Sequence, residues 1–146
     1  MAKVWSIILA GTVLGTLYAA PTALPPNGTH HDAQGRYSGS SRPSGNTTIH
    51  RDRSGRITGK STVSGNYIRH HDAQGRYTGS SQKSGNRIIH RDRSGRITGT
   101  EQHQGNRTIY RDAQGRYTGS ATQHGKQVIY RDAQGRRSGS TQVKPR

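Results

Sequence analysis

The chain has 146 residues and a formal net charge of +16 at pH 7, and only 26% of its residues are hydrophobic. So little apolar material excludes an ordinary globular core, because ordering the backbone costs about 1–2 kcal/mol per residue and burial must offset that cost. The absence of cysteine excludes a disulfide framework and lipid attachment through cysteine. We therefore expect either a disordered chain or a repetitive sheet whose stability accumulates from unit to unit.

The first segment, residues 1–20, has the layout of a signal peptide. Lys3 supplies a basic start, and an uncharged apolar run extends from Val4 to Ala20. A Pro-rich linker, residues 21–26, follows the run. We expect export to the periplasm or the extracellular space. An uncleaved segment would be a membrane anchor, because the run approaches the roughly 20 residues that span a bilayer.

Residues 27–144 read as six tandem copies of a 20-residue unit. The copy NRTIYRDAQGRYTGSATQHG begins at Asn106. Related copies begin at Asn46, Asn66, Asn86 and Lys126, and a degenerate copy precedes them. A fixed period of about 20–50 residues indicates a solenoid or an array.

Each copy carries the pattern Asp-x-x-Gly-Arg, which predicts a tight turn. Aspartate is favoured at the first position of a turn and glycine where φ is positive, so the pattern is typical of a type I turn with a G1 bulge. β-branched and aromatic residues flank the pattern, as they do in strands. A Gly-Asn pair forms a second break between copies. The predicted structural turn residues are Asp32, Asp52, Asp72, Asp92, Asp112, Asp132, Gly35, Gly55, Gly75, Gly95, Gly115 and Gly135.

These turns and flanks predict an all-β fold of tandem β-hairpins that form an elongated meander or a β-solenoid-like sheet. In a solenoid, identical charges would stack ~4.8 Å apart and repel each other. In a row of hairpins, the copies recur at ~10 Å, which is near the screening length at physiological salt. We therefore favour hairpins over a solenoid, with disorder as the remaining alternative.

The predicted register places the aspartate of each turn opposite the arginine that follows four residues later. Such opposite charges contribute up to about 1 kcal/mol for each pair. We further expect Arg111 opposite Tyr117, and Ile109 opposite Gly119, whose missing side chain would make room for the isoleucine. The other face of the strands carries His50, His70, His90, Tyr110 and Tyr130.

The repeat also resembles known families. The pattern Tyr-x-Asp-x-x-Gly-Arg, present from Tyr110 to Arg116, is similar to the YD repeats of Rhs proteins. That resemblance implies a β-shell of the kind that encloses toxins or presents adhesive surfaces. The Thr-Gly after the turn resembles the cell-wall-binding repeats of choline-binding proteins, but residues 27–144 lack the tryptophan of their ligand cages. A weaker similarity, in Gln, Ser, Gly and Asn content, is to curli-type subunits.

The regularly spaced arginines are the candidate binding residues. A row of cations near tyrosines can contact phosphates or sulfates along an anionic polymer or surface, whether polysaccharide, lipopolysaccharide or nucleic acid, without reading a sequence. The candidate polyanion-binding residues are Arg36, Arg51, Arg56, Arg76, Arg91, Arg96, Arg111, Arg116, Arg131 and Arg136. The alternative function is structural or adhesive self-assembly into homo-oligomers through the open edges of a meander.

Enzyme activity, a cofactor, a metal ion and a small-molecule substrate are not predicted. Catalysis needs a nonrepeated acid, base or nucleophile in a pocket, and Glu101, next to a turn, is the sole nonrepeated carboxylate. The histidine column changes to tyrosine at Tyr110 and Tyr130, so packing on a strand face is favoured over metal ligation.

Overall fold

The computed structural model describes residues 28–144, and these form twelve β-strands. The predicted signal peptide, residues 1–20, and the Pro-rich linker, residues 21–26, lie outside the described residues. Within the part of the chain that the structure describes, no helix has the length and apolar character needed to cross a membrane.

The strands form six antiparallel hairpins, one for each 20-residue copy. This confirms the prediction of an all-β fold built from β-hairpins. The strands are β1 (Gly28–Asp32), β2 (Tyr37–Ser44), β3 (Thr47–Asp52), β4 (Ile57–Ser64), β5 (Tyr67–Asp72), β6 (Tyr77–Ser84), β7 (Arg87–Asp92), β8 (Ile97–Gln104), β9 (Arg107–Asp112), β10 (Tyr117–His124), β11 (Gln127–Asp132) and β12 (Arg137–Val143).

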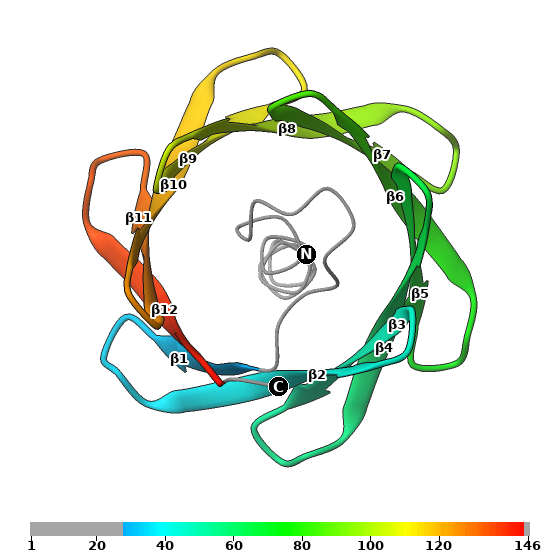
Figure 1. Ribbon diagram of the computed structural model, residues 1–146, viewed down its shortest axis with the longest axis horizontal. Helices are drawn as coiled ribbons and strands as arrows, with labels where there is room; N and C mark the ends of the chain where they lie inside the picture. The colour runs from blue at the N-terminus through cyan, green and yellow to red at the C-terminus, as the bar shows by residue number, and fades with distance from the viewer. Residues whose placement is uncertain (1–27, 145–146) are drawn as a thin grey trace.

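The sheet closes on itself. Each strand pairs with its sequence neighbours, and β1 also pairs with β12, from Gly28 opposite Val143 to Asp32 opposite Gly139 (Figure 1). The predicted elongated meander or solenoid-like sheet is therefore wrong, because the structure is a closed barrel. Strand twist makes a large sheet coil, and closure then gives the first and last strands the backbone partners that an open sheet would leave unpaired.

Two kinds of turn join the strands, one at each end of the barrel. In the first kind, the Gly115 N–H donates to Asp112 O at 3.0 Å and the Asp112 N–H donates to Arg116 O at 3.0 Å, while Gly115 has a φ of 81°. This is a type I turn with a G1 bulge, and only glycine adopts that φ without strain. In the second kind, Gly125 with a φ of 56° occupies the first central position of a two-residue turn, as in type II′.

Because successive strands run antiparallel, all six Asp-x-x-Gly turns lie at the same end of the barrel. They project outward at intervals around the circle of strands (Figure 1). We call this end, with the residue on each side of every turn, the arginine rim. It consists of residues 31–37, 51–57, 71–77, 91–97, 111–117 and 131–137.

Alternate residues of each strand face the inside of the barrel, and these are the most buried ones. An apolar cluster of Tyr110, Ala121 and Val128 lies on this inner face, with Tyr130 and Val143 packed against it. The remaining buried positions are mostly hydroxyl side chains. The inner face of this barrel is therefore lined largely by polar side chains, where other proteins have apolar ones. The buried Ser and Thr residues of the inner face are Ser41, Thr48, Ser61, Ser81, Thr108 and Thr141, whereas Thr100, Ser120 and Ser140 are buried on the outer face, opposite Arg111, Arg131 and Ile129.

A β-bulge in each hairpin changes one predicted pairing. Arg111 lies opposite Tyr117 as expected, but the register then shifts, so that Gly119 lies opposite Tyr110 and Ser120 opposite Ile109. The predicted pairing of Ile109 with Gly119 is wrong because the bulge adds one residue to β10. The missing side chain of Gly119 has a different role, since a Cβ there would overlap the carbonyl oxygen of Arg131 in β11.

Candidate functional site

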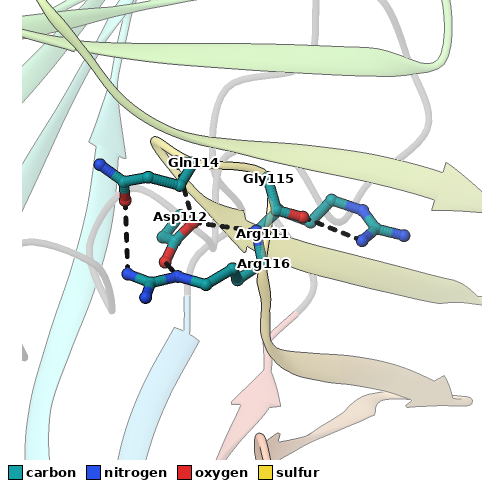
Figure 2. Close-up of polar contacts among 5 residues, drawn as sticks. All are labelled: Arg111, Asp112, Gln114, Gly115 and Arg116. Carbon is teal, nitrogen blue, oxygen red and sulfur yellow. Dashed lines mark hydrogen bonds and ion pairs between the residues drawn. The ribbon is translucent and has the colours of Figure 1, made fainter.

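The arginine rim is built from one hydrogen-bonded motif that Figure 2 shows for the fifth hairpin. Asp112 Oδ1 accepts from the backbone N–H groups of Gln114 and Arg116, both at 2.9 Å. Asp112 Oδ2 accepts from Arg116 Nε at 2.7 Å, and Arg116 Nη2 donates to Gln114 Oε1 at 3.4 Å. The aspartate therefore stabilises the turn by accepting from its backbone, and the arginine side chain bridges the aspartate and the glutamine.

In the third hairpin, electrostatic attraction between aspartate and arginine stabilises the same motif. The Arg76 guanidinium, hydrogen-bonded to the Asp72 carboxylate at 2.7 Å, lowers the pKa of that carboxyl below its ordinary value. The carboxylate is therefore ionised at neutral pH. The arginine also donates from Nη2 to Gln74 Oε1 at 3.5 Å, but its side chain remains about three-quarters exposed, at 77%, so its remaining donors face solvent.

Four of the six expected Asp–Arg side-chain pairs form. They are Asp32–Arg36 at 2.9 Å, Asp72–Arg76 at 2.7 Å, Asp112–Arg116 at 2.7 Å and Asp132–Arg136 at 2.9 Å. Among the residues that the structure describes, no such ion pair forms in the second and fourth hairpins.

The difference follows the sequence of the turn. The four paired turns carry Ala-Gln after the aspartate, whereas the second carries Arg53-Ser54 and the fourth Arg93-Ser94, so these two lack the glutamine that accepts from the guanidinium in the paired turns. Arg56 and Arg96 therefore contact the aspartates Asp52 and Asp92 through their backbone N–H groups instead of their side chains. Their guanidinium groups are available to an external anion.

A second set of arginines lies against the turns from the outer face of the barrel. In each, Nη1 donates to the carbonyl oxygen of the turn glycine, which leaves the other guanidinium donors in solvent. These contacts are Arg51 to Gly55 at 2.8 Å, Arg91 to Gly95 at 3.1 Å, Arg111 to Gly115 at 3.1 Å and Arg131 to Gly135 at 3.0 Å.

All ten arginines predicted from the sequence lie at the arginine rim. Closure of the barrel arranges them in a circle, where an open meander would have placed them in a straight row. The sequence reasoning missed three further arginines at this rim, Arg53, Arg93 and Arg137. Arg53 and Arg93 could have been found, because they lie inside the turns of the HRDRSGR copies.

A second polar arrangement, which the sequence reasoning missed, runs around the inside of the barrel. The ring of His50 is hydrogen-bonded to Ser41 Oγ through Nδ1 and to Ser61 Oγ through Nε2, both at 2.9 Å. His70 joins Ser61 to Ser81 in the same way, at 2.9 and 2.8 Å.

We call the whole series the histidine belt. At one end, His30 Nδ1 is 3.0 Å from Thr141 Oγ1, and at the other, His90 Nε2 is 2.6 Å from Glu101 Oε1. Glu101 is therefore deep in the interior, with 1% of its surface exposed. The belt consists of Thr141, His30, Ser41, His50, Ser61, His70, Ser81, His90 and Glu101.

Burial keeps three histidine rings of the belt uncharged. Desolvation lowers the pKa of His30 and of His50 to about 4, and that of His70 to about 3. Each of these rings is therefore neutral at pH 7 and offers one donor and one acceptor to its two hydroxyl neighbours. The belt is best explained as a structural element, and no group of three or more metal-ligating side chains converges among residues 28–144.

Comparison with known proteins shows a fold and no function. No family model and no curated protein matches the chain. The X-ray structure of a protein from Arabidopsis thaliana is similar to it at a TM-score of 0.50 and 11% identity, over 92% of this chain and 88% of that chain. Alternansucrase in complex with isomaltononaose aligns at 15% identity over 70% of this chain and 12% of its own, and its TM-score of 0.20 carries no argument.

The fold and the rim together define an all-β closed barrel of tandem hairpins with a cationic end. At 11% identity the likeness to the plant protein extends to the fold alone. The resemblances to YD repeats, to choline-binding repeats and to curli-type repeats remain predictions.

Proposed function

We propose that the protein is an exported, non-enzymatic binding protein for anionic cell-envelope or extracellular polymers, which it holds at the arginine rim. The observation that supports this most directly is the gathering of all six Asp-x-x-Gly-Arg turns at one end of the barrel. A patch of one sign of charge attracts polyanions and raises their local concentration.

The unpaired arginines of the second and fourth hairpins are the strongest part of the proposed site. Arg53, Arg56, Arg93 and Arg96 belong to turns whose aspartates form no side-chain ion pair with them among the described residues. An incoming phosphate or sulfate could bind these guanidinium groups without first breaking an ion pair with a carboxylate. Binding of this kind releases counterions, so it is independent of sequence and weakens with salt.

Polymer binding has better support than self-assembly. Assembly through open sheet edges requires strands with an unpaired side, and every strand that the structure describes has a neighbour on both sides. Homo-oligomers would need another surface.

A salt series with a matched pair of variants tests the proposal. Replacing Arg53, Arg56, Arg93 and Arg96 by glutamine should lower the affinity for heparin and for duplex DNA, and reduce the slope of log affinity against log salt by up to about one per arginine. The control variant makes the same charge change away from the rim and should keep most of the slope. It carries R69Q, R87Q, R107Q and K126Q.

Two results would count against the proposal. Equal losses in both variants would mean that net charge, and not the rim, determines binding. Wild-type binding that does not change from low to high salt would contradict an electrostatic site altogether.

A further inference from the structure

Large apolar side chains are exposed at the arginine rim. They occupy the same position in five of the six copies, directly after the arginine that ends each turn. The exposed fractions are 43% for Tyr37, 46% for Ile57, 41% for Tyr77, 43% for Ile97 and 38% for Tyr117. Among the exposed large apolar residues of the described chain, Tyr67 alone lies elsewhere, beside a two-residue turn at the opposite end.

Cations and histidines alternate with these apolar residues. Arg51 lies opposite Ile57, Arg91 opposite Ile97 and Arg111 opposite Tyr117. In the first and third hairpins a histidine takes the place of the arginine, and its ring meets the tyrosine edge to face at centroid distances of 6.3 and 6.0 Å. The rim therefore presents apolar and cationic groups side by side around the circle.

We propose that the arginine rim docks on the surface of an anionic phospholipid bilayer. The boundary between headgroups and acyl chains favours this composition, because aromatic and aliphatic side chains enter the apolar region while arginines contact the phosphates. A soluble polyanion would use the arginines and leave the apolar side chains in water. The inference rests on the same rim as the proposed function, but it names a lipid surface as the partner.

The two isoleucines distinguish a bilayer from a polysaccharide. Tyrosine rings stack on sugars as readily as they enter a membrane interface, whereas an aliphatic side chain gains chiefly from leaving water. Ile57 and Ile97 belong to the second and fourth hairpins, where, in the part of the chain that the structure describes, the guanidinium groups of Arg56 and Arg96 form no ion pair with the turn aspartates. The two aliphatic side chains of the rim and the turn arginines without an ion pair therefore occur on the same two hairpins.

The shape of the rim suits a flat partner. Six turns at one end of the barrel, spread around its circumference (Figure 1), can contact a plane at several points at once. Simultaneous weak contacts raise overall affinity through effective concentration.

Co-sedimentation of the full chain with vesicles tests the proposal. We expect binding to vesicles that contain phosphatidylglycerol and little binding to pure phosphatidylcholine vesicles. The double variant I57S/I97S keeps every charge and every tyrosine, and its affinity for the anionic vesicles should fall at least about tenfold. The Y67S variant removes an equally exposed apolar residue at the other end and should bind as the wild type does.

The same variants separate this proposal from polymer binding. All of them keep residues 1–27, so any contribution of that segment to vesicle binding is common to them, and equal thermal unfolding temperatures establish equal folding. Heparin affinity should be unchanged in I57S/I97S.

Unchanged vesicle binding by I57S/I97S would overturn the lipid proposal, and so would an equal loss of heparin and vesicle binding. Wild-type protein that binds heparin but not anionic vesicles would refute the bilayer and leave the proposed function standing. Wild-type protein that binds anionic vesicles but not heparin would support the bilayer and refute the proposed function.

Discussion

Lowering the pH from 7 to about 4.5 is expected to unfold or strongly destabilise the barrel. The cause is the histidine belt, in which desolvation holds the pKa of His30 and His50 at about 4 and that of His70 at about 3. In the unfolded chain these side chains have the ordinary pKa of 6.5. Between pH 6.5 and pH 4 the unfolded state therefore binds more protons than the folded state, and the free energy of unfolding falls as the pH falls.

The effect is large because three residues contribute in the same window. Each unit of pKa difference corresponds to about 1.4 kcal/mol, so at pH 4.5 the three histidines together remove on the order of 5–8 kcal/mol. That is comparable with the whole stability of a typical domain, about 5–15 kcal/mol. The turn aspartates do not contribute to this difference. The pKa of a carboxyl such as that of Asp72 is below 3.8, so its protonation lowers the free energy of unfolding only in more acidic solution.

Urea unfolding at pH 7 and at pH 4.5 measures this difference directly. The variant H50Q cannot be protonated at that position, so the difference between the two pH values should shrink by about 2–3 kcal/mol whatever its absolute stability. H124Q changes an exposed histidine of β10 and should leave the difference unaltered. Equal stability of the wild type at both pH values would contradict neutral, buried rings at His30, His50 and His70.

Substitution of Gly119 by alanine is expected to cost about 3 kcal/mol or more. A Cβ at this position would overlap the Arg131 carbonyl oxygen and lie 3.4 Å from its carbon and 3.5 Å from Asp132 Cα, all backbone atoms of the neighbouring strand. Backbone cannot move aside as a side chain can, so β10 and β11 must separate and lose part of their ladder.

A glycine in the same hairpin supplies the control. Gly115 has a φ of +81° and nothing within 4 Å of an added Cβ, so G115A should cost only the strain of that backbone conformation, about 1–2 kcal/mol. Urea denaturation of both variants gives the comparison. A smaller loss for G119A than for G115A would show that β10 and β11 are not as close as the barrel requires.

The sequence predicted the local structure well for a physical reason. Asp112, Gly115 and Arg116 lie within five residues of each other, so the turn and its G1 bulge are decided by nearby atoms and dihedral preferences. The same is true of the Arg111–Tyr117 pair, which the turn places across the hairpin.

Closure could not be predicted in the same way. It depends on Gly28 meeting Val143 at the far end of the chain, which follows from the accumulated twist and coil of twelve strands and from no local pattern. The closed circle then decides the form of the candidate site, because it gathers the arginines around one end.

The histidine belt was hidden by the β-bulge. His50 contacts Ser61, which lies one step diagonally from its backbone partner Gly59, and an unbulged register does not bring them together. A signal was present, since the residue eleven positions after each belt histidine is serine or glutamate, whereas after Tyr110 it is Ala121 and after Tyr130 it is Thr141.

A single cross-link tests the closed barrel most directly. Thr29 in β1 lies opposite Gln142 in β12, and the chain has no cysteine of its own. The double variant T29C/Q142C should oxidise to an intramolecular disulfide in the monomer, because cross-strand partners lie within the Cα separation of roughly 4.4–6.8 Å that a disulfide spans. T29C/Q82C places the second cysteine at the equivalent position of β6, across the barrel, and should form none. A T29C/Q142C monomer that stays reduced, or that cross-links only between molecules, would contradict closure.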